Sequence, residues 1–89
     1  MGHPRYSSIL MVSSGTVKPF NGVLRGIKLT AGSTQATCQV KNSATGSTIG
    51  HVIAGANVAA AQQEYDVVFD TSLYVSLAGT GAIAIIEYE

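Results

Sequence analysis

The chain has 89 residues, a formal net charge of zero and a charged fraction of 11%, against about 25% in typical globular domains. This length accommodates one domain, and the single cysteine, Cys38, excludes an intrachain disulfide. Soluble monomers usually carry a net charge that opposes association, so the composition favours a subunit held against partners.

Two classes of partner do not fit the sequence. The five basic residues are scattered along the chain, whereas phosphate binding needs clustered Lys and Arg, so we expect no nucleic-acid partner. The apolar runs at 9–12 and 82–86 are far shorter than the roughly 20 residues of a membrane-spanning helix. The first is also too short for a signal-peptide core of about 7 to 15 residues. We therefore expect no membrane partner, and synthesis in the cytoplasm without export by a signal of its own.

Residues 1–20 are predicted to form an N-terminal arm or a first strand, ahead of a single domain over residues 21–89. The apolar run at 8–13 is followed by Ser14-Gly15, and it fits either a strand or an arm laid on a neighbouring subunit. Asn21-Gly22 lies between apolar residues and is a strong turn signal.

The first strand after this turn is predicted at 23–30. Alternation places Val23, Ile27 and Leu29 on one side of it. Arg25 interrupts that side, but near a strand end its stem can lie on apolar surface while the guanidinium reaches out. A single Arg therefore does not overturn the strand prediction.

Two further strands are predicted at 36–41 and 48–53. The first is half-buried, and Cys38 on its apolar side is expected to be buried and inert, with no helix N-terminus or close basic neighbour to activate it. The second is expected to have one apolar face made of Ile49, His51 and Ile53. That face makes His51 a core or interface histidine.

The stretch 54–64 is the one with helical propensity, and it predicts a turn or a single short helical turn. Alternation predicts the remaining strands at 63–69, 73–77 and 82–88. Together these elements predict an all-β fold. It is a small antiparallel β-sandwich or barrel of seven to eight short strands with an extended N-terminal arm.

No catalytic or metal-binding pattern is recognisable. His51 with Asp66 or Asp70 and a serine supplies the residue types of a hydrolase triad, but no GxSxG motif is present, and we expect no enzyme activity. The candidate metal ligands show no CxxC, HxH or HExxH spacing, so no metal and no cofactor are predicted, although an ion on the symmetry axis of an oligomer would escape this test. These ligands are His3, Cys38, His51, Glu64, Asp66, Asp70, Glu87 and Glu89. Glu64, Asp66 and Asp70 fit a loose calcium site, or more simply the solvated face of an edge strand.

Three stretches carry a resemblance to a known group of proteins. They are GVLRGIKLTAGSTQATCQVKN at 22–42, STIGHVI at 47–53 and LYVSLAGTGAIAIIEYE at 73–89. They resemble the small β-sandwich virion proteins of tailed bacteriophages, in which G-V-L-x-G-I-x-L runs early and L-Y-V-x-L-x-G-T-x-A precedes a last apolar strand. The resemblance covers residues 22–88 and rests on turn and core residues.

The resemblance implies a virion component without enzyme activity, commonly trimeric or hexameric. Such a component decorates or cements the capsid, or belongs to the tail or fibre. We expect a capsid decoration or cement protein that forms a homo-oligomer and binds the major capsid protein or another virion protein. The predicted arm contact is made of Ile9, Leu10, Met11 and Val12, and the predicted oligomer contact of Ile83, Ile85 and Tyr88.

Three alternatives remain open at this stage. One is a tail or head-to-tail accessory protein. Another is a carbohydrate-binding module for host adsorption, for which Tyr74 and Tyr88 are the candidate sugar platform, although tyrosines more often lie in a core or at an interface rim. The third is a small assembly chaperone that is absent from the finished particle.

Overall fold

The computed structural model describes residues 7–57 and 61–89, which form eight β-strands. Short runs of alternating residues separated by Gly, Ser, Thr and Asn favour strands over helices along the whole described chain. The strands are β1 (Ser7–Met11), β2 (Gly15–Lys18), β3 (Gly22–Thr30), β4 (Ala36–Asn42), β5 (Thr48–Ala54), β6 (Ala61–Phe69), β7 (Leu73–Ala78) and β8 (Ile83–Tyr88).

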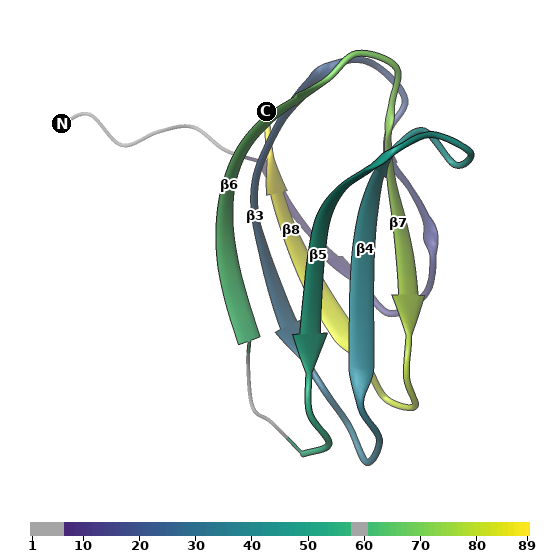
Figure 1. Cartoon of the computed structure of the whole chain (residues 1–89), viewed down its shortest axis with the longest axis vertical. Helices are drawn as coiled ribbons and strands as arrows, with labels where there is room; N and C mark the ends of the chain where they lie inside the picture. Colours follow the sequence, from purple (N-terminus) through teal and green to yellow (C-terminus); the bar gives the residue numbers. More distant parts are fainter. Residues whose placement is uncertain (1–6, 58–60) are drawn as a thin grey trace, which may run out of the picture.

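The strands form two antiparallel sheets of four, packed face to face (Figure 1). The first sheet has the order β1-β8-β3-β6, and the second has the order β2-β7-β4-β5. The pairs β1/β8, β2/β7, β3/β6 and β4/β5 are nested, as if one long hairpin with its tip between β4 and β5 had been rolled up. This is the connectivity of a jelly roll. The predicted β-sandwich is confirmed.

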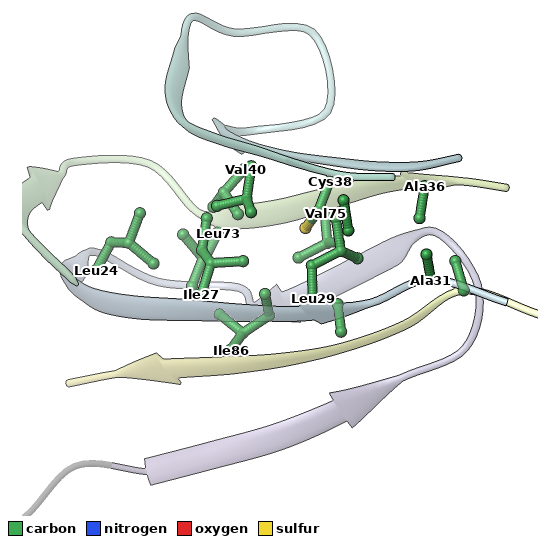
Figure 2. Packing of buried hydrophobic residues seen from close by; sticks show 14 of the residues in the cluster. Leu24, Ile27, Leu29, Ala31, Ala36, Cys38, Val40, Leu73, Val75 and Ile86 are labelled. Carbon is green, nitrogen blue, oxygen red and sulfur yellow. The ribbon is translucent and has the colours of Figure 1, made fainter. Parts of the chain in front are cut away.

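The core lies between the two sheets and is built from their inward faces (Figure 2). Its largest fully buried side chains come from both layers: Phe69, Leu24, Ile27, Leu29, Leu73, Ile86, Val40, Val75 and Cys38. Among the described residues no polar or charged residue is buried. Burial of an aliphatic side chain contributes about 1.5–3 kcal/mol, so this apolar layer is what holds the sheets together.

An irregularity in β3 explains the Arg25 that interrupted its predicted apolar side. The register of β3 shifts between Leu24 and Gly26 against both β6 and β8. An extra residue in a strand reverses which face the following side chains occupy. Leu24 therefore faces the core together with Ile27 and Leu29, and Val23 lies on the other face with Arg25. The predicted grouping of Val23 with Ile27 and Leu29 is wrong for this reason.

Three local predictions also need correction. Asn21-Gly22, predicted as a turn, does not join two paired strands, because it lies between β2 of one sheet and β3 of the other, and neither residue has a positive φ. Within the stretch 54–64, predicted as a turn or a single short helical turn, residues 56 and 57 form a turn and residues 61–64 belong to β6, while 58–60 lie outside the described residues. In β5 the buried residues are Val52, Ala54 and Gly50, while His51 and Ile53 are exposed.

The predicted N-terminal arm is part of the sandwich where it is described. β1 and β2, both within residues 1–20, belong to the first and second sheets respectively. The first-strand alternative therefore describes residues 7–11, while residues 1–6 lie outside the described part of the chain.

Candidate interaction surface

The outer face of the first sheet carries an apolar patch where β8 runs between β1 and β3. Ala82, Ala84 and Ile86 point into the core, so alternation turns Ile83 and Ile85 to the outside. The exposed fraction of Ile83 is 37%, and Ile85 is half-buried.

Strand register places a third apolar side chain in this patch. Leu10 of β1 is directly opposite Ile85, and Lys28 of β3 lies on the other side of Ile85 in the same row. Residues opposite each other in antiparallel strands share a face, so Leu10, which is 58% exposed, adjoins Ile85. We call Leu10, Ile83 and Ile85 the β1–β8 patch.

The seven residues predicted to make contacts separate into two sets. The β1–β8 patch contains three of them, and Val12, just beyond β1, is 67% exposed. Ile9, Met11 and Tyr88 are opposite Ile86, Ala84 and Ser7 or Leu24, respectively, which places them on the inner side of the sheet. Met11 and Tyr88 pack against the core, whereas Ile9 at the sheet edge is 36% exposed. These contact roles remain predictions.

The hydrogen-bond pattern of β8 shows which peptide groups of β1 have no partner within the sheet. Val23 and Glu89 exchange two backbone hydrogen bonds of 2.9 and 2.8 Å, so the peptide groups of Glu89 face β3. Alternate residues of a strand bond to opposite neighbouring strands. The peptide groups of Tyr88, Ile86 and Ala84 therefore face β1. Their partners are the odd-numbered residues of β1. It follows that the N–H and C=O groups of Ser8 and Leu10 point away from the sheet.

Tyr65 closes the opposite side of the sandwich. Its hydroxyl accepts a hydrogen bond from the backbone N–H of His51 (2.9 Å) and donates one to the His51 carbonyl (3.0 Å). Tyr65 belongs to edge strand β6 and His51 to edge strand β5. Gly50 leaves room for this contact, since a Cβ there would lie 3.2 Å from the Tyr65 ring. One phenol therefore ties together the edges of both sheets.

A serine has a similar role beside β2. The Ser14 hydroxyl accepts a hydrogen bond from the Leu77 N–H at 2.9 Å and donates one to the Leu77 carbonyl at 3.4 Å. Leu77 lies in β7 beyond the point where its pairing with β2 ends. The hydroxyl thus occupies peptide groups that the short strand β2 leaves uncovered.

Three charged residues lie close together near the start of β3, away from the β1–β8 patch. Arg25 pairs with Asp66 at 2.6 Å and with Glu89. The Asp66 side chain is 80% exposed, so the pair with Asp66 is a surface interaction of at most about 1 kcal/mol. The sequence pattern did not predict these ion pairs, because the register shift in β3 cannot be recognised from the sequence.

The two carboxylates of the hydrolase-type set have other partners. Asp66 pairs with Arg25, and Asp70 accepts hydrogen bonds from the side chains of Asn42 (2.7 Å) and Thr71 (3.1 Å). These two bonds, that of Asn42 first, hold the pKa of Asp70 below its ordinary value. Cys38 is fully buried as expected, and desolvation raises its pKa to about 11. Within residues 7–57 and 61–89 we find no cavity and no group of three potential metal ligands.

The candidate sugar platform is divided between the sheets. Tyr74 lies on β7 of the second sheet, where alternation with buried Leu73 and Val75 turns it outward. Tyr88 lies on β8 of the first sheet and packs against the core. The two rings therefore do not form one exposed surface.

Comparisons with known proteins give no match, either among protein-family models or among curated proteins. No helix capable of crossing a membrane occurs in the described ranges.

Proposed function

We propose that this chain is a structural subunit of a virion, a capsid decoration or cement protein of a tailed bacteriophage, which binds its assembly through the β1–β8 patch. The observation that carries the proposal is the position of that patch. Leu10, Ile83 and Ile85 lie side by side on the outer face of a sheet whose inner face already supplies the core. Burial of the patch against a partner adds stability that the isolated domain lacks.

The fold supports this role by analogy. Eight strands in jelly-roll order occur in viral capsid domains and also in lectins and cupins, so the fold is compatible with a virion protein without specifying one. The low charge content agrees with a subunit that functions in permanent contact with partner proteins. The sequence resemblance to phage virion proteins narrows the proposal from an assembly subunit to a virion component, for which capsid decoration is the leading role.

The chemistry of the patch defines the kind of contact. Each of its three side chains is aliphatic, and the neighbouring charges are single residues, Lys28 beside Ile85 and Glu87 further along β8. Such a surface gains from removing apolar area from water, about 2.5 kcal/mol per 100 Å² before the losses of ordering and association. Many symmetric copies on one shell multiply a small gain per copy.

The test is the presence of the chain in purified particles, combined with a change to the patch. Mass spectrometry of purified phage particles whose genome encodes this chain should detect the wild-type protein in many copies per particle. Ile83→Lys should remove it from the particles, because a lysine ammonium would have to be desolvated in the contact. Point substitution is preferable to deletion of residues 1–15, which would also remove strand β1.

Val68→Lys provides the matched control. Val68 is 71% exposed on the same outer face but on β6, away from the patch. This variant should stay in the particle. Absence of the wild-type chain from particles would contradict decoration and favour the assembly chaperone. Retention of Ile83→Lys at wild-type copy number would show that the patch is not the contact.

A further inference from the structure

Three of the four edge strands carry features that oppose pairing with another chain. β6 exposes Glu64 and Asp66. On β5, the hydroxyl of Tyr65 occupies the peptide groups of His51. β2 has only four residues, a shift in register and Pro19 directly after its end. Charges, irregular register and covered peptide groups are the ordinary ways in which proteins protect sheet edges.

The fourth edge, β1, has none of these features. Ser7–Met11 contains no charged side chain and keeps one regular register with β8 along all five residues. Its residues are exposed except for half-buried Met11. The peptide groups of Ser8 and Leu10 point outward, as the parity of β8 requires. A regular, uncharged and exposed edge is a template for another strand.

We propose that a second copy of this chain occupies this edge, with the two β1 strands antiparallel and the two four-stranded sheets joined into one sheet of eight strands. An antiparallel pair of identical strands is self-complementary, because each N–H meets a C=O across a two-fold axis. The lack of charge on β1 means that no like charges are brought together. The dimer itself is independent of the proposed function. Its role in a virion rests on that function.

The direction of the peptide groups in β1 determines which residues of the two copies lie opposite each other. Within Ser7–Met11, using all the outward peptide groups requires Ser8 to bond Leu10 of the second copy, and Leu10 to bond Ser8. The two Ile9 residues then face each other on the axis as a pair without hydrogen bonds, where Cα atoms are about 4.5 Å apart. Because the axis is perpendicular to the sheet, the two β1–β8 patches lie side by side on one face. The dimer doubles the apolar surface offered to a shell.

Ser8→Pro tests the edge without changing the patch. Proline removes the outward N–H of Ser8 and leaves Leu10, Ile83 and Ile85 in place, and prolines are tolerated on edge strands. Analytical ultracentrifugation of the isolated wild-type chain should show a concentration-dependent dimer, since a five-residue edge makes a small contact. Ser8→Pro should raise the dimer dissociation constant about tenfold or more, because two ladder bonds are lost per dimer. The thermal midpoint extrapolated to low concentration should not change.

Ile9→Cys tests the register. Mild oxidation should crosslink this variant into a dimer, because two cysteines on the axis fall within disulfide distance. The native Cys38 is buried and does not compete. Val68→Cys, on the opposite edge of the same sheet, should form no disulfide-linked dimer under the same oxidation, although it keeps the noncovalent contact through β1.

A strictly monomeric wild-type chain would overturn this inference, and so would an oligomer that Ser8→Pro leaves intact. Either result would leave the test of particle binding untouched, because the isolated chain is measured without particles. A dimer that forms as described by a chain missing from particles would instead contradict the virion proposal alone.

Discussion

The two edges of the first sheet, β1 and β6, show how the same fold can be open on one side and closed on the other. β6 has nine residues, exposes two carboxylates, and sends Tyr65 across to the backbone of β5. β1 has five residues, no charge and exposed Ile9 and Leu10. Both strands obey the same alternation. The two edges therefore differ in their chemistry rather than in their strand geometry, and the proposed association through β1 follows from that difference.

The largest effect should come from giving β1 a charged side chain, which β6 has and β1 lacks. Leu10→Lys changes a residue that belongs both to the open edge and to the β1–β8 patch. We expect self-association and particle binding each to weaken by at least about 100-fold, from lost apolar burial and desolvation of the ammonium. Sedimentation and a particle-binding assay measure the two effects. The control Val68→Lys should change neither self-association nor particle binding, and equal losses in both variants would contradict the distinction between the two edges.

A smaller effect should follow from opening the closed side. Tyr65→Phe keeps the ring and removes both hydrogen bonds to His51. We expect a loss of only about 1 kcal/mol in the free energy of unfolding. The two hydrogen bonds are lost, but the freed peptide groups are exposed and bind water instead. Urea denaturation measures this change. The variant should also self-associate in a Ser8→Pro background, through the uncovered β5 edge; an unchanged midpoint would mean that Tyr65 does not hold the edges together.

Ser14→Ala should give a still smaller loss. Its hydroxyl has one short and one long hydrogen bond to Leu77, at 2.9 and 3.4 Å, on a residue near the surface. We expect about 0.5 kcal/mol from the same denaturation experiment. Ser13→Ala is the matched control, since it removes a neighbouring exposed hydroxyl. A loss as large as that of Tyr65→Phe would place the main edge closure beside β2 instead of between β5 and β6.

The smallest expected effect concerns pH and the turn that follows β6. Hydrogen bonds from Asn42 and then Thr71 lower the pKa of Asp70 from 3.8. A carboxylate with a lowered pKa stabilises the folded state above its unfolded value, and that contribution disappears as pH falls through the folded value. Wild type should thus lose slightly more stability than Asp70→Asn when the pH is lowered below 3.8. Parallel acid dependence of the two proteins would remove Asp70 from the account of this turn.

The sequence was most informative where alternation was regular. Ala36, Cys38 and Val40 in β4 are buried as predicted, and the all-β class follows from many such short runs. Alternation failed in β3, because the register shift at Arg25 exchanges the two faces within one strand. A bulge of this kind is produced by neighbouring strands distant in sequence, so local pattern does not reveal it.

The prediction of one apolar face made of Ile49, His51 and Ile53 was only partly correct. Ile49, beside the register shift of β5, packs against the core, but His51 and Ile53 are exposed. Val52 and the small residues Gly50 and Ala54 face inward instead. Gly50 lies under Leu24, Ile27 and the Tyr65 ring, where little room is left. The amount of space depends on long side chains from the facing sheet, and single-strand patterns carry no information about it.

The predicted contact residues show the same limit. Ile83 and Ile85 have the same parity and share the outer face, whereas Tyr88 has the opposite parity and packs inward. That difference was readable from the sequence by alternation alone. The adjacency of Leu10 and Ile85 was not, because it depends on the pairing of the first and last strands of the described chain.

The most direct test of the account is amide hydrogen exchange along β1. Ile9 and Met11 bond to β8 by parity and should exchange slowly at every protein concentration, whereas Ser8 and Leu10 should exchange fast in dilute protein and slow down as the dimer or the particle complex forms. Fast exchange at Ser8 and Leu10 in the associated state would contradict the claim that β1 is the open edge through which this chain assembles.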